Sequence, residues 1–567
     1  MGGIGGNTAI QLRGIEKRYS TVYLDGVKMM DPSSSDGSFY LDNLSKNSIE
    51  RIEILKGTQS SLYGSNAIGG TINLFTKIDN NKKGSNLSIS KGSNSTTDIN
   101  YSISNSKEKV NYFFGLNKYY TGGISAMNDN DEKDMYRNDN LVVGINYKIN
   151  DNFQLKNSFR VADTFYEYDE VDKTKPDNNI NTDNLEFSNS LKLIYKNKNT
   201  VNTLSFNKLL IERYTTNSLI NKNNYFGYRD TFSFLSEYNF NFDNKIIYGA
   251  DFEFDSARYQ KDFGISDLEH DESIISQYFD FQFRPFEKIY SSFGFRNDTH
   301  STAKNKKSGR ATFAYKINNN NKFRSSFGAG VRFPALYDYA YGYQTIQDKG
   351  GSLEELKAER GISFDLGYDT FLPKLNLNLS TTYFRTEQKN SLLSNARTDW
   401  VIRNVTGVNT SEGIELSGTW KPINKKFNLN LGYTFTNSYD ANTCSSEELI
   451  SYSDNECRGK SKIATSKVRV PLHALQSNFN YKFNDYFDSL IKAKYISETR
   501  DFGNINNNWK DQILPSYTLV DINNNYKISK NSYIFFNINN LFNKEYQQAF
   551  GYSSPKRSVY FGFKKLY

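Results

Sequence analysis

Segments in which apolar and polar residues alternate recur along almost the whole chain from about residue 85. Two clean examples are 375–383, "LNLNLSTTY", and 427–435, "FNLNLGYTF". Because successive side chains of a β-strand point to opposite faces, this pattern predicts strands with one apolar and one polar face. The chain has no run of 18 apolar residues, so we expect no transmembrane helix. Strands that present apolar side chains at every second position are also typical of a transmembrane β-barrel with a polar lumen.

The composition supports a single β architecture. Aromatic residues make up 15% of the chain, with 42 Phe and 41 Tyr, while Pro is scarce at 9 of 567 residues, a balance that suits strands better than helices. No shift in composition marks separate soluble domains. The net charge of +8 is spread along the whole chain, which makes it weak evidence for a nucleic-acid partner, and we expect none.

The connections between the predicted strands alternate between short and long, as in outer-membrane barrels. Longer stretches without alternation cover 121–139, 162–184, 333–358, 387–409 and 437–470. Ten short polar turns are predicted near Lys107, Asn150, Asn199, Asp243, Pro285, Asn319, Pro373, Asn424, Asn484 and Ser529. With both barrel ends on the short-turn side, ten turns join 22 antiparallel strands, the size class whose lumen is plugged.

A glycine-rich segment near the N-terminus is the candidate plug. Residues 51–77, "RIEILKGTQSSLYGSNAIGGTINLFTK", give a strand, a loop and a second strand. The spacing from Gly64 to Thr71 resembles a phosphate-binding loop, but Gly70 occupies the position of the required lysine, so nucleotide binding is not expected. Glycine permits tight turns that are closed to residues with a Cβ. The loop residues singled out are Gly57, Tyr63, Gly64, Gly69 and Gly70.

Motifs at both ends of the chain resemble the TonB-dependent outer-membrane receptors. "LRG" at 12–14, "VYLDGV" at 22–27 and the stretch from Ile49 to Lys77 resemble the plug domain, and "NLFNKEY" at 540–546 with the closing "GYSSPKRSVYFGFKKLY" resembles the last two strands. The resemblance implies an all-β fold with a partial plug at 1–79 and a 22-stranded transmembrane barrel at 80–567. Within the family, the glycine-rich stretch is most similar to the cobalamin receptors.

The resemblance also implies a function: active uptake of a bulky metal chelate across the bacterial outer membrane. The expected partners are a TonB-type energy-transducing protein with an ion-gradient-driven complex in the inner membrane, the chelate itself and outer-membrane lipid, and we expect a monomer. Cobalamin is the favoured cargo, with ferric siderophores as the alternative and haem less favoured. Two other classes stay open: a passive porin, and a nontransporting surface receptor or adhesin that binds through its long loops. No catalytic set can be assigned from the sequence, so no enzyme activity is expected.

Four charged residues match the arginines and carboxylates that pair between the plug and the barrel in this family. The resemblance assigns Arg13 and Arg51 to the plug, and Asp365 and Glu415 to the barrel. Paired guanidinium and carboxylate groups are directional, and buried pairs suit a latch better than a source of stability. The alternative is that these are ordinary charges facing the lumen. Only some ten residues precede "LRG", so the exposed TonB box of the family is expected to lie in a longer natural chain.

Family geometry implies that cargo contacts come from the plug loop 30–40, from the apex 60–65 and from an aromatic outer segment. The predicted cargo contacts are Asp31, Ser34, Tyr40, Ser60, Ser65, Tyr339 and Tyr341. Tyrosine offers a large amphipathic surface that can grip a bulky ligand. The spacing of two between Tyr337, Tyr339, Tyr341 and Tyr343 is equally that of a strand face.

This interpretation requires no cofactor, but three sets of residues bear on metal binding and cross-linking. Carboxylates at Asp129, Asp131, Asp134, Asp169 and Asp172 supply hard oxygen ligands that suit calcium, although acidic loop residues are often simply solvated. The only histidines are His270, His300 and His473, which makes haem ligation less favoured. Cys444 and Cys457 lie in the longest predicted loop and are expected to form a disulfide in an oxidising compartment.

Overall fold

The structure is a computed structural model. It describes residues 3, 10–37, 39–79, 83–128, 132–169, 180–216, 222–261, 268–340, 356–393, 402–404, 407–423, 425–440, 465–505 and 508–567. Cys444, Cys457, Asp129, Asp131, Asp172 and Tyr341 lie outside these residues. None of the helices in the described part of the chain is long and apolar enough to span a membrane.

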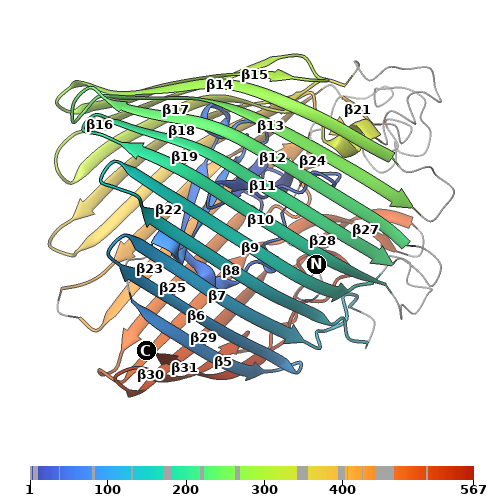
Figure 1. Ribbon diagram of the computed structural model, residues 1–567. Coiled ribbons are helices and arrows are strands. Elements are labelled where there is room, and N and C mark those ends of the chain that lie inside the picture. Colours follow the sequence, from blue (N-terminus) through green and yellow to red (C-terminus); the bar gives the residue numbers. More distant parts are fainter. Residues whose placement is uncertain are drawn as a thin grey trace.

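Twenty-two long antiparallel strands close into one barrel, which confirms the predicted fold (Figure 1). The first eleven are β5 (Gly84–Gly92), β6 (Thr96–Lys107), β7 (Val110–Thr121), β8 (Tyr136–Lys148), β9 (Phe153–Glu167), β10 (Asn181–Lys196), β11 (Thr200–Thr216), β12 (Lys222–Asn239), β13 (Lys245–Lys261), β14 (Leu268–Phe286) and β15 (Ile289–His300). The others are β16 (Lys306–Lys316), β17 (Asn321–Arg332), β18 (Glu359–Leu372), β19 (Leu377–Lys389), β22 (Val408–Trp420), β23 (Phe427–Asp440), β25 (His473–Lys482), β26 (Phe487–Ile496), β29 (Tyr517–Ser529), β30 (Ser532–Asn539) and β31 (Ser558–Leu566).

The last strand closes the barrel on the first. β31 pairs with β5 in antiparallel register from Tyr560 opposite Gly92 to Leu566 opposite Asn86. The terminal residue continues this pairing, because the Tyr567 N–H donates to the Ser85 carbonyl at 2.9 Å. Closure leaves no strand edge exposed to lipid, where an unpaired backbone group would cost several kcal/mol.

The ten short turns lie where the alternation predicted them, and they share one rim of the barrel with the C-terminus (Figure 1). The turn expected at Pro285 lies slightly later, at residues 287–288, because β14 continues through Pro285 to Phe286. A register irregularity between Phe283 and Phe286 accommodates this proline. Proline has no N–H for the ladder, so within a sheet it is tolerated at such bulges.

The opposite rim carries the long connections, and several contain small elements of their own. A hairpin of β27 (Thr499–Ile505) and β28 (Asn508–Leu514) lies between β26 and β29, and β24 (Thr465–Ser466) pairs with the outer end of β23. A second two-stranded sheet pairs β20 (Leu392–Leu393) with β21 (Arg403–Asn404). We call this rim the loop rim and the other the short-turn rim.

Residues 10–79 form a plug inside the barrel (Figure 1). Its four-stranded sheet has the order β2 (Val27–Lys28), β1 (Ser20–Leu24), β4 (Gly70–Thr76), β3 (Ile49–Lys56). Short helical turns complete it: η1 (Lys17–Tyr19), η2 (Leu41–Asn43), η3 (Lys46–Ser48), α1 (Ser60–Tyr63) and η4 (Lys77–Asp79). The small apolar core of the plug includes Val22, Leu24, Ile72 and Leu74, and it packs on Leu209 and Ile211 of the barrel wall.

The two faces of each strand differ as the alternation predicts. Leu431 on β23 is 46% exposed on the outside of the barrel, whereas its neighbour Asn430 lies on the other face and is partly buried. Buried polar and charged groups such as Arg160, Glu186 and Ser276 line the lumen. The barrel therefore presents an apolar belt to lipid and a polar inner wall to the plug.

We expect Leu431→Arg to lower the free energy of unfolding in lipid vesicles by about 2 kcal/mol, because it places a charge on the lipid-facing belt. Asn430→Arg is the matched control, since the same side chain then faces the lumen and should cost much less. The measurement is a urea titration of both variants in the same vesicles. Equal losses would contradict the assigned faces.

Candidate functional site

Arg13 joins the plug to the barrel wall. Its guanidinium contacts Asp365 on β18 and donates two hydrogen bonds to Glu415 on β22, at 2.9 and 3.3 Å. It also lies 4.5 Å from the centroid of the Phe384 ring. Burial alone would lower the pKa of Arg13, but the hydrogen bond and charge of Glu415, together with Asp365, outweigh burial and raise it. Three of the four residues assigned to the latch therefore meet at one point in the lumen.

The fourth residue, Arg51, does not reach these carboxylates. Its side chain is 60% exposed, pairs with Glu53 at 3.1 Å and lies over the Phe75 ring at 4.2 Å. The place expected for Arg51 is taken by Lys56, whose Nζ lies 2.6 Å from Glu415 Oε1. Lys56 is at the other end of β3, about 17 Å along an extended strand from Arg51.

Lys56 was not predicted from the sequence, and the contact that identifies it is visible only in the structure. Lys56 immediately precedes Gly57, and Gly57 lies so close to the wall that a Cβ there would be 2.8 Å from Asp365 Oδ2. Because Lys56 is next to this contact, it is better placed to pair with Glu415 than Arg51, which lies five positions earlier.

The glycine loop turns where its glycines have positive φ. Gly57 has φ +74° and Gly64 has φ +71°, conformations that side chains with a Cβ rarely adopt. At Gly64 a Cβ would lie 3.1 Å from the Arg296 guanidinium on β15, so glycine also permits a close approach to the wall. Between them lies α1, where the Tyr63 carbonyl accepts a hydrogen bond from the Tyr23 hydroxyl at 2.8 Å. Gly69 and Gly70 lead into β4, and a Cβ at Gly69 would lie 3.0 Å from the Ile15 side chain.

Several residues predicted to contact cargo join the plug to the wall or stabilise its loops in this structure. Asp31 accepts hydrogen bonds from Ser33 and from Arg213 at 2.8 Å, and the Ser34 hydroxyl donates to Asp36 at 2.9 Å. Both predicted residues are buried. Such buried ion pairs fix position and registry more than they add stability.

At the apex of the plug, Ser65 connects to the loop rim. Its hydroxyl accepts a hydrogen bond from the Phe333 N–H at 3.1 Å, and Ser60 on α1 is fully buried. Tyr40 is half-buried, and burial raises its pKa. The predicted role of these residues in cargo binding stays a prediction.

The aromatic outer segment begins as a helical turn at residues 336–340, so the spacing of Tyr337 and Tyr339 does not mark a strand face. Tyr339 is 1% exposed and packs with Leu356, Leu392 and Ile402 beneath the loop rim. Its ring stacks on His270 with centroids 5.0 Å apart. In this conformation Tyr339 builds the loop structure and offers little surface to a ligand.

The other two histidines also have structural contacts. His300 accepts hydrogen bonds at Nδ1 from the Thr302 and Ala303 N–H groups, at 3.1 and 3.0 Å, and its Nε2 lies 3.2 Å from Glu272. His473 Nδ1 lies 2.9 Å from the Tyr433 hydroxyl.

Three carboxylates come together at the loop rim. Glu132, Asp134 and Asp169 each offer an oxygen, and these atoms all lie within 4.8 Å of one another. Asp169 Oδ2 accepts hydrogen bonds from the Met127 N–H at 2.7 Å and the Ser125 hydroxyl at 3.1 Å, whereas its buried Oδ1 has no hydrogen-bond partner among the described residues. Asp134 accepts from the Ala126 N–H. This donor set of hard oxygens fits a calcium ion.

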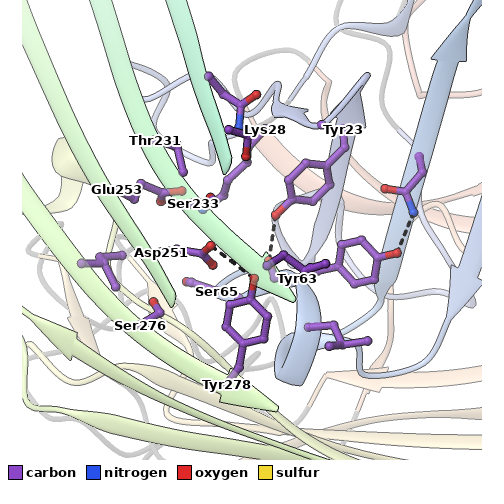
Figure 2. Close-up of a pocket in the computed structure, with 18 of the residues that line it drawn as sticks. Tyr23, Lys28, Tyr63, Ser65, Thr231, Ser233, Asp251, Glu253, Ser276 and Tyr278 are labelled. Atoms are coloured by element: carbon purple, nitrogen blue, oxygen red, sulfur yellow. Dashed lines mark hydrogen bonds and ion pairs between the residues drawn. The ribbon is translucent and has the colours of Figure 1, made fainter. Parts of the chain in front are cut away.

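A chamber of about 340 Å³ lies between the plug sheet and strands β11 to β15 (Figure 2). Tyr23 and Tyr63 of the plug face Tyr278, Asp251 and the hydroxyls of the wall across it (Figure 2). A second cavity of about 830 Å³, which we call the inner cavity, lies next to Arg13, Lys56 and Glu415. The plug therefore fills the lumen without packing tightly against every part of the wall.

Comparison with known proteins agrees with this architecture. The β-barrel model of the TonB-dependent receptors matches residues 75–541, and the plug-domain model of the same receptors matches residues 1–71. The chain belongs to the TonB-dependent receptor family. It is accordingly an outer-membrane receptor, and in this family the short-turn rim faces the periplasm.

Curated relatives and solved structures extend the comparison. A vitamin B12 transporter, BtuB, from Vibrio vulnificus strain CMCP6 is 22% identical over 577 residues, covering 99% of this chain and 86% of the relative. An iron-regulated outer membrane virulence protein from Vibrio cholerae is 23% identical, covering 99% and 87%. The crystal structure of the siderophore receptor PirA from Acinetobacter baumannii superposes with a TM-score of 0.79 at 16% identity, covering 98% and 91%. The last likeness establishes the fold alone.

We expect Arg13→Ala to destabilise the plug by about 3 kcal/mol, because it leaves two carboxylates in the lumen without their main partner. Arg51→Ala is the matched control and should change stability by less than about 0.5 kcal/mol, since an exposed pair contributes little. Hydrogen exchange of the plug amides in detergent-purified protein measures both. A larger effect for Arg51 would contradict the assignment.

Proposed function

We propose that this receptor imports a bulky, amide-bearing metal chelate of the cobalamin type by active transport. The observation that carries the proposal is a lumen filled by a folded plug whose contacts with the wall are hydrogen bonds and ion pairs. Such contacts keep the barrel closed at rest and can be exchanged for others when the plug moves. Vitamin B12 transporters aligned over 99% of the chain support cobalamin as cargo.

The second candidate cargo is a ferric siderophore. It is supported by the iron-regulated relative and by the likeness of the fold to a siderophore receptor. Haem is less favoured, because His270 and His300 pack among aromatic rings and His473 lies near Tyr433. Axial ligation by tyrosine would be required instead.

Of the two other classes of function, the plug speaks against one, and a deletion tests the other. A passive porin needs an open lumen, whereas the plug occupies this one from Ile10 to Asp79. A nontransporting adhesin would bind a macromolecule through its long loops, and deletion of residues 437–470 would then abolish binding without affecting uptake. The family consists of receptors and transporters, so an enzymatic role has no support.

Transport needs an energy source, because a barrel in the outer membrane has none of its own. TonB-dependent receptors interact with TonB, and the proposal is that an inner-membrane ion gradient acts through a TonB-type protein on this plug. Closure of β31 on β5 completes the barrel within one chain, so no second chain is needed for the fold, and the proposal is a monomer.

We further infer a structural calcium ion at Glu132, Asp134 and Asp169. Their converging carboxylates and the buried Oδ1 of Asp169, which has no hydrogen-bond partner among the described residues, support a cation between the residues just before β8 and those just after β9. The ion would neutralise three adjacent negative charges and hold these loops together.

Equilibrium binding to detergent-purified receptor tests the cargo. Cyanocobalamin should bind saturably and with a submicromolar dissociation constant, while ferric enterobactin and haemin should not compete. Binding of ferric enterobactin without cyanocobalamin would keep the transporter and change its cargo. Binding of none of the three would contradict all the proposed cargoes.

Calcium should raise the melting temperature of the purified receptor relative to EDTA, because a ligand that binds only the folded state stabilises it. Asp169→Asn should remove most of this shift. Asp151→Asn, in an exposed turn on the periplasmic rim, is the matched control and should keep it. An equal shift in both variants would contradict the site.

A further inference from the structure

The helix α1 separates two cavities between the plug and the barrel wall. The chamber lies on its outer side, against β11 to β15. The inner cavity lies on its other side and extends to Tyr290 and Lys322, next to the turns of the periplasmic rim. Leu62 of α1 lines both cavities. This one-turn helix is therefore the partition between them.

A third, smaller cavity of about 50 Å³ continues the series toward the outside. It shares Lys28, Ser65, Glu253 and Ile274 with the chamber. At its other end it reaches the segment 333–336 beneath the loop rim. The three cavities thus form a line from the loop rim to the periplasmic rim.

The chamber is lined by apolar as well as polar groups, and its charges are balanced. The barrel wall contributes neutral donors and acceptors, namely Thr203, Ser205, Asn207, Thr231, Ser233 and Ser276. Three cations, Lys28, Lys192 and Arg296, stand against three carboxylates, Asp251, Glu253 and Asp298. Lys28 lies 2.8 Å from Glu253, and Arg296 lies 3.1 Å from Asp251 and 2.7 Å from Asp298. Lys192 Nζ donates to the Asp25 carbonyl at 2.6 Å. Such a wall suits a solute that offers amides and hydroxyls and carries little net charge, because no unpaired charge awaits a counterion.

The partition belongs to a loop that is closed at its own base. The Gly57 N–H donates to the Gly69 carbonyl at 3.1 Å, and the Gln59 N–H donates to the Ala67 carbonyl at 2.8 Å. Gly57 and Gly70, with φ +74° and +150°, stand at its two ends. Residues 57–69, which we call the gate loop, can therefore turn about these glycines as a unit.

A small number of hydrogen bonds hold the gate loop to the wall. The Thr58 N–H donates to Ser363 Oγ at 2.8 Å, the Asn66 N–H donates to the Val331 carbonyl at 3.0 Å, and Ser65 accepts from the Phe333 N–H. The hydroxyl of Ser60 is buried without a hydrogen-bond partner among the described residues. Hydrogen bonds of this kind exchange for water at modest net cost.

We propose that the chamber and the inner cavity are two halves of one transit route for a neutral, amide- and hydroxyl-bearing chelate, and that the gate loop closes it. The gate loop moves off the wall as a unit while the plug sheet stays folded. The inference rests on the proposed uptake function and adds to it the path of the cargo and the part of the plug that moves.

A disulfide between the gate loop and the wall tests the movement. Ser61 Cβ lies 3.4 Å from the position of a Cβ at Gly294 on β15, close to the spacing of about 3.5–4.5 Å in disulfides. In a background carrying Cys444→Ser and Cys457→Ser, the pair Ser61→Cys with Gly294→Cys should reduce uptake of radiolabelled cyanocobalamin by at least about tenfold when oxidised. Reduction should restore uptake, and cyanocobalamin binding at the cell surface should not change.

A second disulfide is the matched control. Val22 and Ile72 are register partners on β1 and β4, away from the cavities. Val22→Cys with Ile72→Cys locks the plug sheet and should leave uptake intact in both redox states. Loss of uptake with this pair would show that the sheet must separate, which would overturn the inference. Uptake that persists with the oxidised gate-loop disulfide would overturn it as well.

Conductance measurements in planar bilayers test the transit route independently of which cargo the receptor takes up. Replacement of residues 58–68 by two glycines removes the partition, and the shortened receptor should conduct ions where the parent does not. A closed shortened receptor, with its plug sheet still protected from trypsin, would overturn the route. If the shortened receptor conducts but the parent takes up no cyanocobalamin, the cargo proposal fails and the route stands.

Discussion

Backbone hydrogen bonding in lipid is the constraint from which the rest of this structure follows. A strand that crosses the bilayer must pair on both edges, so the sheet must close, here by β31 on β5. Closure of 22 strands encloses a lumen too wide for side chains alone to fill. The chain therefore needs a second folded part inside the barrel, and the polar inner wall determines how that part is held.

The plug is held mainly by polar contacts, and this suits a part that has to move. Its own apolar core is small, and only a few wall residues such as Leu209 and Ile211 extend it. Elsewhere the contacts are ion pairs and hydrogen bonds, with Arg13 at the centre of one group and Lys28 in another. An apolar interface of the same extent would resist separation more strongly, because its exposure to water costs free energy that no new hydrogen bond offsets.

The barrel could be predicted from the sequence because its signals are local. Alternation over ten residues sets the strands, and polar turn residues set the ten short turns, with Pro285 displaced only because it lies in a bulge.

The site could be predicted only in part. Arg13, Asp365 and Glu415 met as the family resemblance implied, but Lys56 replaced Arg51, since position along β3 decides which cation reaches the wall. Tyr339 was selected as an aromatic surface, yet it is buried in a helical turn. The cavities left no local signal, because they depend on how two distant parts of the chain lie against each other.

The pairing of β5 with β31 also sets an order of assembly. The plug and β5 leave the ribosome before β31, the strand that completes the barrel. The plug therefore spends the whole of synthesis and export without the wall that satisfies its charged groups. It must either wait in the periplasm as a soluble, partly folded segment or fold while the barrel closes around it. In both cases the pairing of β31 with β5 decides when the plug is captured.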